Sequence, residues 1–175
     1  MIFPELNTTR LRLRELTSAD AEIIFQLRSD PEVNKYLDRT SAGHIMDAVS
    51  HIERVSSFYK EGKAVNWVME EKDTATPVGT ICIWNINMES LEGELGYELL
   101  PKYQRKGLMK EAIDAVLDWA FKQYKFQKLF AWTHNQNLAS STLLSRSNFT
   151  RDEEEENKQN KEDLGPCVIF SRNAN

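Results

Sequence analysis

The chain has 175 residues, of which 41% are hydrophobic, 10% aromatic and 28% charged, and its formal net charge is −5. These values are typical of a globular domain and exclude a disordered or fibrous chain. The negative charge argues against a nucleic-acid partner, because such proteins present a basic surface to phosphate. No apolar run approaches the roughly 18 residues that span a bilayer. We therefore expect one cytoplasmic domain over residues 1–175, without a membrane partner.

The N-terminal third predicts one strand followed by two helices. Residues 10–16 alternate charged side chains with leucines, a period of two that indicates a half-buried strand. A helix is expected over residues 18–30, because Thr and Ser offer caps before it and Pro31 ends its apolar stripe. A second helix is predicted over residues 41–61, where apolar side chains recur at helical spacing and Gly62 can stop the helix.

The rest of the chain predicts three strands, a helix, and then a mixture of strands and one helix. Polar turns separate the first three strands and are short enough to make antiparallel hairpins. The strongest helical pattern, with apolar residues every three or four positions, runs from residue 107 to about residue 124. The order predicts an α/β fold with a central sheet of about seven strands and about four flanking helices. The remaining predicted elements are strands over 64–71, 77–86, 92–100, 128–133, 149–153 and 167–172, and a helix over 137–147.

The most informative stretch is GELGYELLPKYQRKGLMKE, residues 93–111, in which a strand leads through a basic turn into a helix. The first amides of a helix have no backbone partner and sit at the positive end of the helix dipole, so they can hold an anion. Gly107 would let the backbone approach a phosphate closely, while Arg105, Lys106 and Lys110 add positive charge. The nucleotide signatures GxxxxGK[ST] and GxGxxG are both absent.

Three motifs in this order resemble those of one family. Residues Gln104 to Met109 match the Q/R-x-x-G-x-G/A signature of the GCN5-related N-acetyltransferase (GNAT) superfamily at its first four positions, and Met109 departs at the sixth. The preceding strand is similar to the E-x-G-Y-x-L-x-P segment of the branch that includes ribosomal-protein N-terminal (serine/alanine) acetyltransferases. Residues 137–149 resemble that branch's N-x-A-S-x-x-x-L-x-x-x-G-F motif, with Asn148 in place of the glycine.

The resemblance implies a GNAT fold, a mixed sheet that splays after its fourth strand, with the pantetheine arm of acetyl-coenzyme A (acetyl-CoA) in the gap. Acetyl-CoA would be a co-substrate, and no metal would be required. A main-chain amide of the fourth strand would stabilise the oxyanion formed on the thioester. The residues assigned to the cofactor by resemblance are the main chain of Leu99 and Leu100, the loop and helix start at Gln104, Arg105, Lys106, Gly107, Leu108, Met109 and Lys110, and Asn137, which is otherwise a plain helix cap.

Two side chains are candidates for proton transfer. An amine attacks a thioester only when it is neutral, so the reaction needs a base or a water held by one. Glu94 occupies the glutamate of the family's strand motif, on the same face as Glu98; it could instead bind the substrate or be an ordinary solvated strand residue. Ser140, favoured over Ser141, could protonate the departing thiolate, although serine at a helix start is commonly a cap.

Other reactive or aromatic side chains favour structural roles. Cys82 and Cys167 are expected as buried thiols without a neighbouring histidine, so direct transfer is favoured over an acetyl-cysteine intermediate. The three histidines have no metal spacing, and the four tryptophans are expected in the core. The acidic residues 152–156 are expected to form a solvated loop, or else to meet a basic substrate.

The leading hypothesis is therefore an N-acetyltransferase that moves the acetyl group of acetyl-CoA to a primary amine by direct attack in a ternary complex. The acceptor would be a protein N-terminal α-amine or a small-molecule amine, and the protein a monomer or homodimer. The alternatives are a non-catalytic acetyl-CoA-binding or sensor module on the same fold, and a scaffold that does not bind acetyl-CoA.

Overall fold

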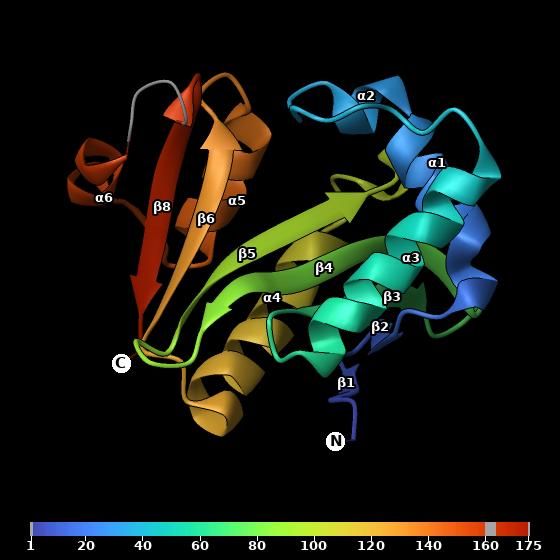
Figure 1. The fold of residues 1–175 in the computed structure, drawn as a ribbon, viewed down its shortest axis with the longest axis horizontal. Helices are drawn as coiled ribbons and strands as arrows, with labels where there is room; N and C mark the ends of the chain where they lie inside the picture. The colour runs from blue at the N-terminus through green and yellow to red at the C-terminus, as the bar shows by residue number, and fades with distance from the viewer. Residues whose placement is uncertain (1, 160–163, 175) are drawn as a thin grey trace.

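The computed structural model describes residues 2–159 and 164–174 and confirms a mixed sheet flanked by helices (Figure 1). The sheet has eight strands in the order β1-β2-β3-β4-β5-β6-β8-β7. All neighbouring strands are antiparallel except β5 and β6, which are parallel. The strands are β1 (Leu6–Asn7), β2 (Leu11–Glu15), β3 (Val65–Glu71), β4 (Thr76–Asn87), β5 (Glu92–Leu99), β6 (Lys128–His134), β7 (Thr150–Arg151) and β8 (Cys167–Asn173).

Helices cover both faces of the sheet. They are α1 (Ala21–Ser29), preceded by the 3-10 turn Ser18–Asp20, α2 (Pro31–Asn34), α3 (Ile45–Lys60), α4 (Leu108–Asp118), α5 (Leu138–Arg146) and α6 (Glu153–Lys158). The predicted helix over 107–124 is confirmed, with its last six residues, Trp119–Tyr124, in π-helical conformation. Within the described ranges, none of the helices has the length and apolar character needed to cross a bilayer.

Alternation along the strands separates two cores. Trp67 and Met69 of β3 point toward α4 in the main cluster, which also receives Leu144 of α5. Val68, between them, points the other way and packs against Ile24 of α1 and residues of α3 in a second cluster. Helices α1 and α3 therefore cover one face of the sheet, which we call the outer face, while α4 and α5 cover the opposite, inner face.

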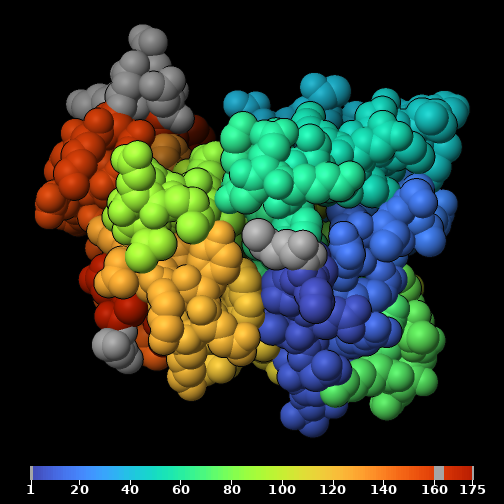
Figure 2. Space-filling model, turned by 60° about the horizontal axis from the view of Figure 1, so that its bottom comes forward, coloured from blue at the N-terminus to red at the C-terminus, as the bar shows by residue number. Residues whose placement is uncertain are grey.

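The N-terminal segment closes one end of this packing. Phe3 lies 5.1 Å from Tyr59 of α3 and 6.0 Å from Trp67, measured between ring centroids. Trp67 in turn packs edge-on against Trp119 at 5.2 Å. In Figure 2 these N-terminal residues (dark blue) lie between α3 (blue-green) and the end of α4 (orange).

The structure adds short elements that the sequence pattern does not predict and corrects two boundaries. Pro31 starts helix α2 rather than only ending α1, because proline fits the first helical position. The Asp30 carboxylate caps this helix by accepting the amides of Glu32 and Val33. Helix α3 begins at Ile45, not at residue 41, after a cap by His44. The strand expected over 149–153 is limited to Thr150–Arg151, and the expected acidic loop begins with helix α6.

Candidate active site

The sheet opens between β5 and β6. The two strands pair over three positions, from Glu92 with Lys128 to Glu94 with Phe130, whereas β5 stays paired with β4 as far as Leu99. In the part of the chain that the structure describes, no strand pairs with the other edge of β5 beyond Glu94. Such an edge presents backbone donors and acceptors that an extended ligand with its own amides can satisfy. The side chains of Leu99 and Leu100 are buried. The Leu100 amide donates to the Val78 carbonyl at 3.0 Å and the Leu100 carbonyl accepts the Tyr103 amide at 2.9 Å, so the backbone groups of Leu100 are already bonded within the protein.

The loop after β5 is shaped to hold an anion. A 3-10 turn, Pro101–Tyr103, follows the strand, and then Arg105 and Gly107 take left-handed conformations with φ of 61° and 78°. Gly107 is the N-cap of α4, and its carbonyl accepts the Glu111 amide at 3.1 Å. The amides of the first three helical residues have no carbonyl one turn earlier, so they are free to bind phosphate oxygens.

The side chains of this loop divide between packing and charge. Gln104 donates to the Leu99 carbonyl at 2.9 Å and so ties the loop to the end of β5. Leu108 and Met109 are buried in the main core. The departure at Met109 therefore places a side chain under the helix, not over the anion site. Lys110 is bound to Asp114 one turn further on, whereas Lys106 lies 5.3 Å from the Tyr103 ring centre.

A brace that the sequence pattern does not reveal holds this loop. Arg10 donates to the Lys106 carbonyl at 2.9 Å and makes an ion pair with Glu111 at 2.8 Å. The Glu111 carboxylate also accepts the Thr8 hydroxyl and the Arg10 amide. Although burial opposes ionisation, these hydrogen bonds hold the pKa of Glu111 below its usual value. The first turn of α4 is therefore fixed to the start of β2.

Glu94 lies where the opening begins, in a row of aromatic side chains. The strand register places it opposite Trp84 of β4 and beside Phe130 of β6. Alternation puts all three on the outer face, because Ile83 and Leu95 next to them point into the main core. Burial raises the pKa of Glu94, while a 2.9 Å hydrogen bond from Asn85 opposes that rise. A carboxylate with a raised pKa in a cleft is suited to accept a proton.

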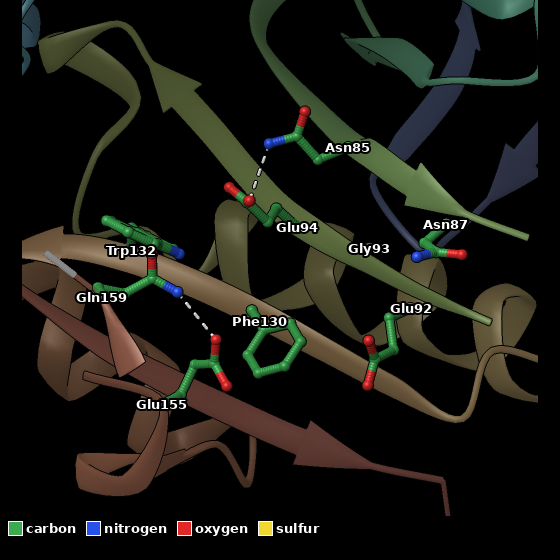
Figure 3. A pocket seen from close by; sticks show the side chains of 9 residues that line it. All are labelled: Asn85, Asn87, Glu92, Gly93, Glu94, Phe130, Trp132, Glu155 and Gln159. Carbon is green, nitrogen blue, oxygen red and sulfur yellow. Dashed lines mark hydrogen bonds between the residues drawn. The ribbon is translucent and has the colours of Figure 1, made fainter. Parts of the chain in front are cut away.

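A cavity of about 140 Å³ opens beside Glu94 (Figure 3). Its walls come from β5, from Phe130 and Trp132 of β6, and from Glu155 and Gln159 at α6. Figure 3 shows Glu94 on β5 across from Phe130 and Trp132 of β6, with Glu155 and Gln159 beyond them on the side of α6. The cavity is the space from which an acceptor amine could reach Glu94.

The second catalytic candidate lies on the inner face. Ser140 Oγ is 2.8 Å from the Tyr97 hydroxyl. Tyr97 lies three residues after Glu94 in β5, so the two side chains point to opposite faces of the sheet. Burial raises the pKa of Tyr97 to about 12, so the phenol stays neutral. Asn137 caps α5, its side-chain oxygen accepting the Ser140 amide at 3.1 Å. The plain-cap alternative for Asn137 is thus present in the structure, and a role toward the cofactor stays a prediction.

Other predicted residues have different positions from those expected. Glu98 shares the outer face with Glu94 but is bound to Arg39, at 2.9 Å, in the connection before α3. Trp67 and Trp119 are buried as expected, whereas Trp84 is 46% exposed and Trp132 is half-buried, so the core expectation is wrong for these two.

Neither cysteine is fully buried, although both were expected to be. Cys82 and Cys167 are free thiols of intermediate exposure. Burial nevertheless raises the pKa of Cys82 to about 12. Asn148 has a φ of 60°, so it supplies the left-handed conformation for which the motif uses glycine.

Comparisons with known proteins agree with this geometry. The sequence profile of the acetyltransferase (GNAT) domain matches residues 10–150. The uncharacterized N-acetyltransferase YoaA of Bacillus subtilis is 32% identical over 151 residues, covering 86% of this chain and 85% of YoaA.

Solved structures share the fold at lower identity. The ribosomal-protein-S5-alanine acetyltransferase of Vibrio fischeri has a TM-score of 0.80 at 19% identity, covering 98% of this chain and 97% of that one. RimJ of Mycobacterium smegmatis, in complex with CoA-disulfide, has a TM-score of 0.84 at 16% identity, covering 98% and 88%.

The chain belongs to the GNAT family of acetyltransferases. It is an acetyl-CoA-dependent N-acetyltransferase similar to the ribosomal-protein acetyltransferases.

Proposed function

We propose that the protein transfers the acetyl group directly to a primary amine, with both substrates bound, and that Glu94 removes the amine proton itself or through a water. The observation that carries this proposal is the position of Glu94, with its raised pKa, at the point where β5 and β6 separate. The cavity on the outer face supplies the acceptor side of the site. The open edge of β5 and the start of α4 would bind the pantetheine and the phosphates of acetyl-CoA from the other side.

Ser140 is the proposed donor of a proton to the departing thiolate. Its amide is fixed by Asn137 and its hydroxyl by Tyr97. We propose that the neutral tyrosine is the donor in this hydrogen bond, which leaves the serine proton free to point into the gap. Tyr97 is therefore a positioning residue that acts through Ser140. A route through an acetyl-cysteine is disfavoured, because the raised pKa of Cys82 keeps the nearby thiol protonated.

The experiment is a kinetic comparison of wild type with Glu94→Gln, using acetyl-CoA and a panel of primary amines and peptides. Loss of a general base should lower kcat by about a hundredfold or more. Acetyl-CoA binding, measured by calorimetry, should be unchanged, since the phosphate and pantetheine contacts lie elsewhere. A variant as fast as wild type on an accepted amine would exclude Glu94 as the base.

A further inference from the structure

Aromatic and acidic side chains surround Glu94 on the side from which the acceptor amine would approach. The outer face of β4, β5 and β6 carries Trp84, Phe130 and Trp132 around Glu94. None of these aromatic side chains belongs to the main core or to the second core. The main core takes their neighbours of opposite alternation, such as Ile83 and Leu129. Exposed aromatic surface beside a catalytic group is typical of a ligand-binding wall.

The charges that line the cavity are all negative. Glu92, Glu94 and Glu155 contribute carboxylates, and among the described residues the lining contains neither lysine nor arginine (Figure 3). One oxygen of Glu155 accepts a hydrogen bond from Gln159 at 2.9 Å, and the other lies 3.4 Å from Lys158 Nζ, an ammonium group shared with Glu154 at 3.2 Å. The charge of Glu155 is therefore only partly offset, and its carboxylate keeps lone pairs for a ligand.

The neighbouring lysine shows that the aromatic surface accommodates a cation. Lys128 Nζ lies 4.6 Å from the centre of the Phe130 ring. That ammonium group is neutralised by Asp152 at 2.8 Å, so it does not cancel the charge of the cavity. Trp132 presents a better π surface for the same interaction, because indole binds cations more strongly than phenyl.

We infer that the preferred acceptor is a small aliphatic diamine: one amine is acetylated beside Glu94 while the second, still charged, rests against Trp132 on the side of Glu155. The inference rests on the proposed function and adds the substrate class. Charge complementarity selects a dication, the aromatic wall accommodates its methylene chain, and a cavity of about 140 Å³ suits a short chain better than a folded peptide.

The test compares two acceptors of equal length, 1,5-diaminopentane and n-pentylamine, with acetyl-CoA. Wild type should have a kcat/KM at least about tenfold higher for the diamine, the size of one favourable cation–π contact with a carboxylate partner. Glu155→Gln and Trp132→Leu should each reduce this ratio mainly through a higher KM for the diamine.

The matched control is Glu153→Gln, which makes the same charge change on an exposed position of α6 outside the cavity lining. Equal kcat/KM for the two amines in wild type, or equal ratios in Glu155→Gln and Glu153→Gln, would overturn the inference. The inference would also be overturned if the enzyme acetylated an Ala-Lys peptide faster than an Ala-Gln peptide and did not acetylate the diamine. That result would assign a peptide acceptor. Acetylation of pentylamine without diamine preference leaves the proposed function standing, whereas no product from any of these acceptors contradicts both.

Discussion

At the scale of single residues, the site is governed by what surrounds one carboxylate. Glu94 is flanked by Trp84 and Phe130, and its carboxylate accepts a hydrogen bond from Asn85. Burial and the hydrogen bond act on the pKa in opposite directions. Because burial prevails, the pKa is raised, and the carboxylate is a better proton acceptor than an exposed glutamate.

This balance predicts how activity depends on pH. Glu94 must be ionised to act, so kcat/KM falls as pH drops through its pKa. Since the Asn85 amide stabilises the carboxylate, Asn85→Gly should raise the pKa of Glu94. The acidic limb of the pH–rate profile should then move to higher pH, by about one pH unit for one charge-assisted hydrogen bond. Glycine is chosen because Asn85 has a φ of 48°, which glycine tolerates. Asn85→Asp should move the limb further, because it adds a like charge.

The pH–rate profile of kcat/KM between pH 4 and 8 checks this order. Asn87→Asp is the control, since Asn87 also lines the cavity but bonds to the amides of Glu89 and Ser90 rather than to Glu94. If the control moved the limb as far as Asn85→Asp, general charge in the cavity, and not the hydrogen bond, would set the pKa.

At the scale of elements, the start of α4 combines a required backbone shape with positive charge, and the two can be separated. Gly107→Ala should cost about 1 to 2 kcal/mol of unfolding free energy, because its φ of 78° is left-handed; space for the added carbon exists, with Arg10 Nη2 at 3.5 Å. Arg105→Asn keeps a residue that tolerates its φ of 61° and should change stability by less than about 0.5 kcal/mol.

Both variants should bind coenzyme A more weakly, but for different reasons. Arg105→Asn would remove the predicted contact with a phosphate, so the affinity of this variant should depend less steeply on salt than that of wild type. Gly107→Ala displaces the amides and should keep the wild-type salt dependence. Urea titrations and calorimetry at two salt concentrations measure these effects. Full stability in Gly107→Ala would show that the left-handed turn is not required.

The periodic elements could be predicted from the sequence, and the contacts across the site could not. Strands β2 to β5 and helix α4 carry regular alternation or helical spacing over many residues, which gives their type and approximate bounds. Helices α2 and α6 are too short to show a period. The Tyr97–Ser140 bond joins positions 43 residues apart, and the Arg10–Glu111 pair joins positions 101 apart, so both depend on tertiary packing.

The positions of Trp84 and Trp132 outside the core could have been predicted from the alternation of their strands. Trp84 alternates with Ile81 and Ile83 in β4, and Trp132 alternates with Leu129 and Ala131 in β6. Because one face of each strand is filled by these aliphatic residues, the period of two already places both indoles on the other face.

At the scale of the whole molecule, the ligand should join the two parts of the sheet that separate between β5 and β6. Acetyl-CoA at a hundred times its dissociation constant should stabilise the native state by about 2.7 kcal/mol. For a chain of this length the melting temperature should rise by about 5 to 10 °C. ATP, which lacks the pantetheine arm, should give a smaller rise. Equal shifts with the two ligands would mean that the phosphate site alone is used and that the open edge of β5 is not.

The short pairing of β5 with β6 also has a mechanical meaning. Three residue pairs connect a unit made of β1 to β5 with a unit made of β6, β8 and β7. Few sheet hydrogen bonds cross this junction, so the main core, which includes residues of both units, is what chiefly holds the units together. A pantetheine arm lying along the free edge of β5 would add hydrogen bonds beside this junction. The amide hydrogens of β6 and β8 would then exchange with solvent more slowly, although the ligand touches mainly the other unit, and release of the product would restore their mobility.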